Sequence, residues 1–97
     1  MTPEGQIKKE IREWLAIHGI YYANVAGGAF SKPGDPDIIA DVDGHFLAIE
    51  AKTKTGRQSE QQKVCQMRVT ESGGVYIIAR SVEDVMAAVS HLRKTVS

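Results

Sequence analysis

The sequence predicts a small α/β domain of the α+β type, in which a mixed sheet is flanked by helices. Three observations support this fold class. Two runs rich in β-forming residues, 38–42 and 45–51, flank the pair Asp43-Gly44, which is typical of a two-residue hairpin turn. Segments near both ends of the chain carry apolar residues at helical spacing. A further apolar run, 75–79, follows a helical segment and is placed to join the sheet in parallel.

The first helix is expected to run from Thr2 to about His18. Thr2 is a good N-cap, and Pro3 suits the first turn, where a missing N–H costs nothing. Glu4 lies in the same turn, where an acid complements the helix dipole. Gly19 is expected to end the helix. Its core-facing stripe consists of Ile7, Ile11, Trp14, Leu15 and His18.

Residues 20–25 are rich in β-formers and are expected to form the first strand. A loop containing Gly27-Gly28 then leads the chain to Asp37. This loop lacks the glycine and lysine spacing of a phosphate-binding P-loop, so we expect no nucleotide cofactor.

The hairpin turn fixes which residues face each other. Val42 faces His45, and counting outward places Asp37 opposite Glu50, with Lys52 on the same face as Glu50. Like charges that face each other across two strands repel, and a divalent cation between them would remove the repulsion. A plainer interpretation makes Asp37 a turn residue and leaves Glu50 and Lys52 solvated on an edge strand. Against it, Glu50 interrupts a run that otherwise looks buried on both faces.

The helix after the hairpin is expected over about residues 60–70. Ser59 is a good N-cap, and Gln62 follows three residues later, which is the spacing of a capping box. Cys65 is expected in the core, and further residues are expected to face inward, namely Val64, Met67 and Val69. The strand 75–79 comes next, and a last helix then carries a core stripe of Val82, Val85, Met86, Val89 and Leu92.

The composition is that of a globular protein, with 42% hydrophobic and 25% charged residues. A chain of 97 residues is expected to form one domain, 1–97, with the element order α-β-β-β-α-β-α. The single cysteine excludes an internal disulfide and a cysteine-cluster metal site, which suits a cytoplasmic protein. No run is apolar enough to span a membrane, and the N-terminus lacks a signal-peptide pattern, so no membrane association is expected.

Several hydrolase classes are excluded by what the sequence lacks. The histidines show no metal-ligand spacing, and there is no Gly-x-Ser-x-Gly nucleophile elbow. The formal net charge is zero, which by itself does not favour a nucleic-acid binder, but charge distribution matters more than the sum. Between residues 52 and 68 a single acid, Glu60, is set against the basic residues Lys52, Lys54, Arg57, Lys63 and Arg68.

The sequence Pro36-Asp37 followed by Glu50-Ala51-Lys52 resembles the PD-(D/E)xK signature of restriction-endonuclease-like nucleases. The surrounding pattern is most similar to one branch, the VRR-NUC (virus-type replication-repair nuclease) domain, over roughly Glu4 to Val89. The shared features are an amphipathic first helix, Asn24 with Gly27-Gly28, Gly34-Asp-Pro-Asp-Ile-Ile, Phe46-Leu-Ala-Ile-Glu-Ala-Lys-Thr, Gly56, Ser59 with Gln62, and Gly73-Gly74.

The resemblance implies a restriction-endonuclease-like core and a DNA endonuclease that depends on Mg²⁺ or Mn²⁺. Asp37 and Glu50 offer the hard oxygen ligands that Mg²⁺ prefers, with the Ala51 carbonyl as a third. Lys52 would orient or deprotonate the attacking water. By resemblance, Gln62 would help to position water or phosphate, although a capping box explains it as well, and Glu4 would lie near the metal, although a helix-end acid is the plainer interpretation.

DNA contacts are expected from Lys32, Lys54, Arg57 and Ser59, with a plain connector as the alternative for the loop of Lys32. The resemblance also implies a homodimer acting on branched DNA such as four-way junctions, of phage or bacterial origin and working in the cytoplasm. The best interface candidates, which are equally good core candidates, are Tyr21, Tyr22 and Phe30. The alternative function is a non-catalytic nucleic-acid-binding module on a nuclease-like fold; a general interaction domain would leave the paired acids unexplained.

Overall fold

The computed structural model describes residues 1–29 and 31–94. The elements follow in the order α1 (Pro3–Ile17), β1 (Tyr21–Asn24), β2 (Ile38–Val42), β3 (His45–Ala51), α2 (Glu60–Glu71), β4 (Val75–Ala79) and α3 (Val82–Lys94). The predicted α+β class and element order are confirmed. None of the helices among the described residues is long and apolar enough to cross a membrane.

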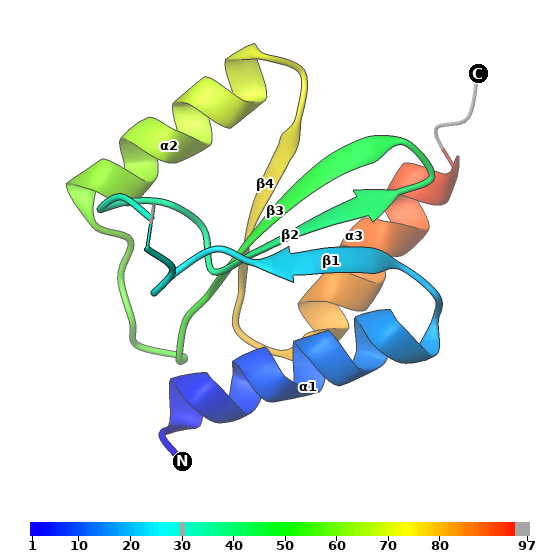
Figure 1. Cartoon of the computed structure of the whole chain (residues 1–97), viewed down its shortest axis with the longest axis horizontal. Helices are drawn as coiled ribbons and strands as arrows, with labels where there is room; N and C mark the ends of the chain where they lie inside the picture. Colours follow the sequence, from blue (N-terminus) through cyan, green and yellow to red (C-terminus); the bar gives the residue numbers. More distant parts are fainter. Residues whose placement is uncertain (30, 95–97) are drawn as a thin grey trace.

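The four strands form one mixed sheet in the order β1-β2-β3-β4 (Figure 1). The first three strands are antiparallel neighbours, and β4 pairs in parallel with β3. The chain between β3 and β4 passes through α2, so a helix makes the connection that a parallel pair requires.

The central hairpin has the predicted register, from Val42 opposite His45 to Ile38 opposite Ile49. Asp43 and Gly44 both have positive φ angles, 51° and 89°, as a two-residue turn of this kind needs.

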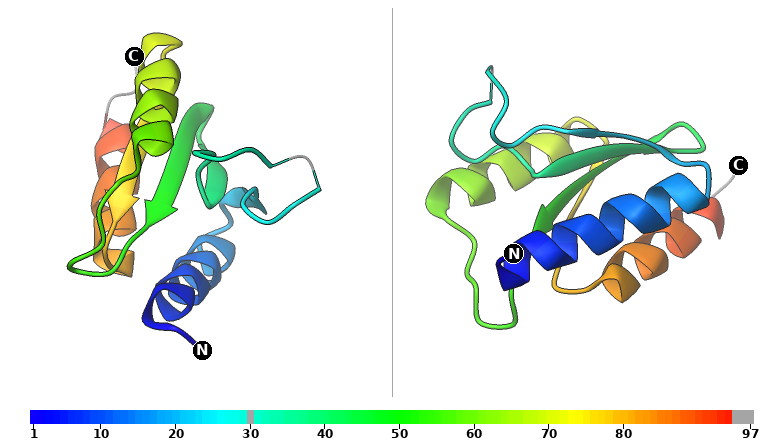
Figure 2. Two further views of the ribbon diagram at one scale, coloured as in Figure 1. Left: turned by 90° about the vertical axis from the view of Figure 1, so that its left-hand side faces the viewer. Right: turned by 60° about the horizontal axis from the view of Figure 1, so that its bottom comes forward.

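The helices lie on both faces of the sheet. Figure 2 shows α1 and α3 side by side on one face, with α2 on the other. The main core lies between the sheet and the α1–α3 pair. Its largest fully buried side chains are Ile11, Leu15, Ile38, Val42, Leu47, Ile49 and Val85.

The helix α2 packs less deeply than expected. It has no buried residue, and the prediction that Val64 and Met67 face inward is wrong, because 49% and 53% of these residues are exposed. Cys65 and Val69 are half-buried, so Cys65 is only a partial core residue. The neighbouring stripe through Cys65 and Val69 faces the sheet, and residues one position away point about 100° further around the helix.

Two further core predictions are wrong. Met86 is 42% exposed on α3. His18 lies outside the core at the end of α1, where its ring stacks on Trp14 with centroids 4.2 Å apart. Both residues lie at the margin of an otherwise correct stripe, where helical spacing alone does not show how far the neighbouring element extends.

Candidate active site

A cavity of about 490 Å³ opens where the end of β3 meets the first turns of α1 and α2. The loop between β1 and β2 closes its remaining side. The cavity is lined by Glu4, Ala26, Gly27, Ser31, Lys32, Pro33, Gly34, Asp35, Asp37, Glu50, Lys52 and Gln62. The five predicted catalytic residues all line this one cavity, although they come from four separate segments of the chain.

Asp37 is buried and tied to the backbone on both sides. Its carboxylate Oδ2 accepts a hydrogen bond from the amide of Ala51 at 2.8 Å, its amide donates to the Ile49 carbonyl at 3.0 Å, and its carbonyl accepts from Val25 at 2.9 Å. These contacts hold the carboxylate at the end of β3.

The predicted regular facing of Asp37 and Glu50 is wrong in detail. The β2–β3 ladder ends with Ile38 opposite Ile49, and the Asp37 amide donates to the carbonyl of that same Ile49. Asp37 and Ile38 therefore both lie opposite Ile49, which is the arrangement of a β-bulge. The bulge turns the Asp37 side chain toward the Ala51 amide.

Glu50 is only 3% exposed, and its Oε1 atom has no hydrogen-bond partner among the described residues. Burial, followed by the negative charge of Asp37, raises the pKa of Glu50 to about 8, although Lys52 acts in the opposite direction. Burial, followed by the negative charge of Glu50, raises the pKa of the Tyr76 hydroxyl to about 12. A buried acid with an unpartnered oxygen lacks the stabilisation that folded proteins usually give such a group.

Two lysine ammonium groups stand beside the two acids. The Nζ atom of Lys52 lies 3.8 Å from Oε2 of Glu50, and its side chain is 14% exposed. The Nζ atom of Lys8 lies 3.2 Å from Oδ1 of Asp37 and 3.5 Å from Oε2 of Glu4. Burial alone would lower the pKa of Lys8, but attraction to Asp37 and Glu4 outweighs it and raises the pKa.

Lys8 is one residue of the site that the sequence analysis did not predict. The available signal was its position four residues after Glu4, which places both side chains on one face of α1. Its contact with Asp37 crosses from α1 to the β2 end and has no local signature.

Gln62 combines two geometries. Its side-chain Oε1 atom accepts a hydrogen bond from the backbone amide of Ser59 at 2.8 Å, and the Ser59 hydroxyl accepts one from the backbone amide of Gln62 at 3.1 Å. The capping box is therefore confirmed. The Gln62 side chain also lines the cavity, so capping and a position beside the acids coexist.

Glu4 lines the cavity but is bound to Lys8. Within residues 1–29 and 31–94, no group of three or more His, Cys, Asp or Glu residues lies close enough to hold a metal ion. Any ion in this cavity would therefore need Asp37, Glu50 and groups of another kind, such as a backbone carbonyl and water.

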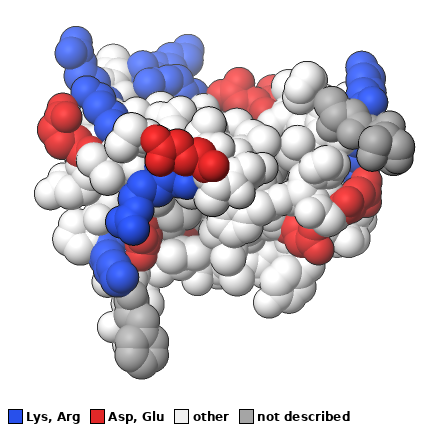
Figure 3. Space-filling model, turned by 90° about the horizontal axis from the view of Figure 1, so that it is seen from above, with Lys and Arg blue, Asp and Glu red and all other residues white. Residues whose placement is uncertain are grey.

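The predicted DNA contacts lie outside the acid pair. Lys32 is exposed and lines the cavity, while Lys54, Arg57 and Ser59 are exposed on the segment that leads into α2. Figure 3 shows the molecule from above, with Lys and Arg side chains gathered mainly over the half that holds α2 and acidic side chains among them.

Arg80, also missed from the sequence, anchors the segment before α2. Its Nη1 atom donates to the carbonyl oxygens of Thr53 and of Gly56, the latter at 2.9 Å. The residue directly after β4 thus holds the loop that follows Lys52.

No protein-family description matches the chain, and no curated protein matches it. Solved structures do match it, and they include the following two. One, described as "VRR_NUC domain", superposes with a TM-score of 0.74 over 100% of both chains at 19% identity. The other, described as "VRR_NUC domain protein", gives a TM-score of 0.73 over 97% of this chain and 90% of that chain, also at 19% identity. The chain has the fold of these two proteins, and the predicted resemblance is confirmed at the level of fold.

Proposed function

We propose that this chain, which has the fold of VRR-NUC domain proteins, is an Mg²⁺- or Mn²⁺-dependent endodeoxyribonuclease that hydrolyses phosphodiester bonds. The observation that carries the proposal is the buried Glu50 carboxyl, whose Oε1 atom is unpartnered within the described residues, next to Asp37 in an open cavity. A structural role would favour a satisfied pair of polar groups at this position, whereas an ion-binding role requires a free oxygen.

The residues present fit a hard divalent cation. Asp37 and Glu50 supply carboxylate oxygens, the ligands that Mg²⁺ and Mn²⁺ favour. The Ala51 amide points toward Asp37, and in an extended strand the carbonyl of a residue points to the same side as its amide. The Ala51 carbonyl is thus a suitable third ligand, with water completing the shell.

When bound, the ion would supply charge neutralisation at the scissile phosphate and activation of water. The chain's own groups would do the rest. Lys52 would orient the attacking water and place a positive charge beside the phosphate. The side-chain amide of Gln62 would donate a hydrogen bond to water or to a phosphate oxygen, and Lys8 would neutralise the Asp37 carboxylate until an ion takes its place.

The alternative, a non-catalytic nucleic-acid-binding module, is favoured by one observation. Each acid is already paired with an ammonium group, Asp37 with Lys8 and Glu50 with Lys52, so neither is without a counter-charge. The unpartnered oxygen of Glu50 favours the enzyme. Cleavage separates the two functions.

We further propose that the enzyme acts as a homodimer on branched DNA such as four-way junctions. One set of Asp37, Glu50 and Lys52 cuts one strand at a time, and a two-fold pair would bring two sets to two strands. Tyr21, which is 74% exposed, and Phe46 line a shallow hollow on the sheet with Ile39 and Asp41. This hollow is the best-supported interface; the candidate Tyr22 is half-buried, and the candidate Phe30 lies outside the described residues.

The test is a panel of four-way junction, flap, duplex and single-stranded DNAs, incubated with Mg²⁺, with Mn²⁺ and with chelator. Cleavage that requires the ion and disappears in Glu50→Gln, but survives in the distant variant Lys94→Gln, supports the nuclease. Tight DNA binding with no cleavage under any condition would instead favour the binding module. Equal cutting of junction and linear duplex would remove the branched-DNA part of the proposal alone.

A further inference from the structure

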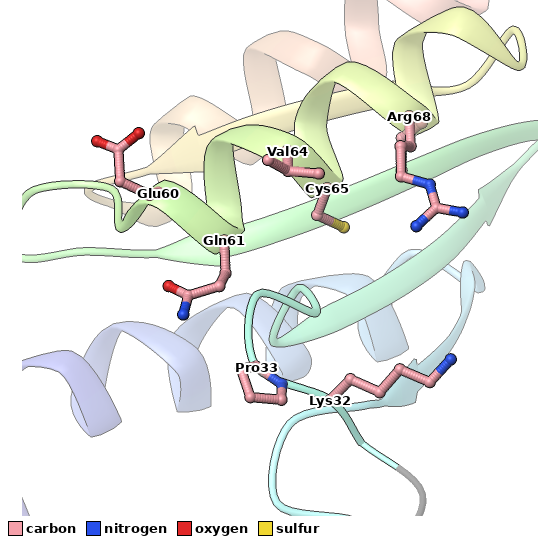
Figure 4. Close-up of a pocket in the computed structure, with 8 residues that line it drawn as sticks. Lys32, Pro33, Glu60, Gln61, Val64, Cys65 and Arg68 are labelled. Carbon is pink, nitrogen blue, oxygen red and sulfur yellow. The ribbon is translucent and has the colours of Figure 1, made fainter.

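A second groove lies beside the cavity, between α2 and the loop that precedes β2. Its volume is about 580 Å³, and it is lined by Lys32, Pro33, Glu60, Gln61, Val64, Cys65, Arg68 and Val69. Figure 4 shows Gln61, Cys65 and Arg68 pointing from α2 toward the loop that carries Lys32 and Pro33, whereas Glu60 points away. The groove and the cavity share Lys32 and Pro33, so the two hollows adjoin.

The wall between the two hollows is fixed by a close contact. Gly34 has a φ of +94°, and a Cβ placed there would lie 2.6 Å from the carbonyl oxygen of Gln61. The loop backbone therefore touches the first turn of α2, which is possible only with glycine at this position. Because Gln61 lines the groove and Gln62 lines the cavity, successive residues of one helical turn face the two hollows.

The groove combines positive charge with apolar surface. Neither Lys32 nor Arg68 forms an ion pair with an acid within the described part of the chain. Glu60, the acid at its margin, is bound to Lys63 at 3.2 Å. The same groove is also lined by the apolar side chains of Pro33, Val64 and Val69.

We propose that this groove binds a single-stranded segment of nucleic acid next to the phosphate that is cut. Lys32 and Arg68 would contact phosphates, and a base would lie against Val64 and Val69. An intact duplex turns its base faces inward and offers mainly phosphates, which cations alone can bind, whereas a single strand also exposes base faces to apolar side chains. The inference rests on the proposed nuclease function and specifies its substrate further: branched DNA in which a stretch of the strand beside the cut is unpaired.

The single cysteine of the chain supplies a direct test, because Cys65 lines the groove and is half-buried. The Glu50→Gln variant is kept in chelator so that nothing is cut. The rate at which a small thiol reagent modifies Cys65 is measured alone, with saturating oligothymidylate, and with a duplex of equal length, binding being followed by fluorescence anisotropy. We expect the single strand to slow modification about tenfold by covering the thiol, and the duplex to slow it less than about twofold.

A second measurement uses a matched pair of variants on the same helix. Arg68→Gln is expected to weaken binding of the single strand about fivefold and to lower the slope of log affinity against log salt by about 0.7, the value for one lost phosphate contact. Lys63→Gln removes the same charge from α2 outside the groove and is expected to leave single-strand affinity within about twofold.

Three results would overturn the inference. Bound single strand that leaves Cys65 as reactive as before would place the strand elsewhere, and equal protection by the duplex would remove the preference for an unpaired strand. Equal losses in Arg68→Gln and Lys63→Gln would reduce the effect to general charge. In each of these cases the proposed nuclease function still stands. If the protein binds no DNA of any form, both the nuclease function and the single-strand groove are ruled out.

Discussion

Asp37 and Glu50 lie in the same cavity but are held in different ways. Asp37 has a backbone donor at Ala51 and a cation at Lys8, so its charged form is well accommodated. Glu50 has one oxygen without a hydrogen-bond partner in the described part of the chain, and its pKa is raised, so its charged form is poorly accommodated without an ion. Replacing each acid by its neutral amide should therefore change the stability of the protein in opposite directions.

The first prediction is that, without metal, Glu50→Gln stabilises the protein at pH 8 while Asp37→Asn destabilises it. The pKa of Glu50 rises from 4.5 to about 8 on folding. The folded state thus holds this proton more tightly than the unfolded state, and stability from this group is complete below pH 4.5 and is lost as the pH rises toward 8. Glu50→Gln avoids that loss and should raise the free energy of unfolding at pH 8 by on the order of 1–3 kcal/mol. Asp37→Asn should lower it by about 1–3 kcal/mol, because the charged contacts of Asp37 are lost.

Thermal melting in chelator from pH 5 to pH 9 measures both effects, and cleavage with Mg²⁺ should be abolished in both variants. A wild-type melting temperature that climbs with pH in a manner dependent on Glu50 would show that its ionised form is the stabilised one. Full cleavage by either variant would remove these acids from the proposed mechanism.

The second prediction concerns Lys52, whose ammonium group lies 3.8 Å from Glu50. Lys52→Met keeps the aliphatic stem that packs in the wall, and should bind Mn²⁺ and DNA while cutting about 10²–10⁴ times more slowly, because an acid–base group is lost. Single-turnover cleavage and calorimetric Mn²⁺ titration separate rate from binding. A near-normal rate between pH 6 and pH 9 would leave Lys52 as a surface cation.

At the scale of elements, the first turn of α2 is both a helix start and a wall of the cavity. Ser59 and Gln62 cap each other, and only Gln62 also lines the cavity. This difference allows the two functions of the turn to be tested separately.

The third prediction is that Ser59→Ala and Gln62→Ala lower stability by a similar amount, about 1 kcal/mol, because each removes half of the capping box. Only Gln62→Ala is expected to slow cleavage by about tenfold or more, because only it removes a donor from the cavity. Urea unfolding and single-turnover rates check the two halves. If both variants cleave equally slowly, the loss of rate comes from a change in the first turn of α2 and not from the Gln62 side chain in the cavity.

The elements that sequence predicts best are those with local causes. The hairpin register follows from the two-residue turn at Asp43-Gly44, and the start of α2 follows from Ser59 and Gln62. The features that the sequence does not predict depend on contacts between residues far apart in the chain. Arg80 contacts Thr53, 27 residues away, and the bulge at Asp37 depends on how the loop before β2 enters the sheet.

The same distinction explains the errors on α2. Val64 and Cys65 are adjacent apolar residues, and periodicity allowed either to face inward. The choice depends on how much of the sheet α2 covers, which is a property of the packed domain.

At the scale of the whole molecule, the two faces of the sheet are covered unequally. The pair α1 and α3 lies across one face, whereas α2 contacts β4 on the other and leaves Tyr21 and Phe46 exposed over β1 and β3. Exposed aromatic side chains grouped on one surface are typical of an interface.

The fourth prediction is that Tyr21→Ser weakens self-association about tenfold or more, because aromatic residues dominate the energy of small interfaces. Ile17→Ser is the matched control, because Ile17 is 80% exposed but lies outside the hollow of Tyr21 and Phe46. Sedimentation velocity across micromolar concentrations measures both. A wild-type protein that stays monomeric throughout, or equal weakening in the two variants, would remove this interface.

The contact between Lys8 and Asp37 has a consequence for when the enzyme would switch on. Since an ammonium group already neutralises Asp37, a divalent ion would have to enter by exchange, breaking one favourable pair to form another. The concentration of free ion at half-activation would then reflect the difference between the two pairings. A lysine outside the signature would thus set the activation threshold of the nuclease as much as the acids that bind the ion.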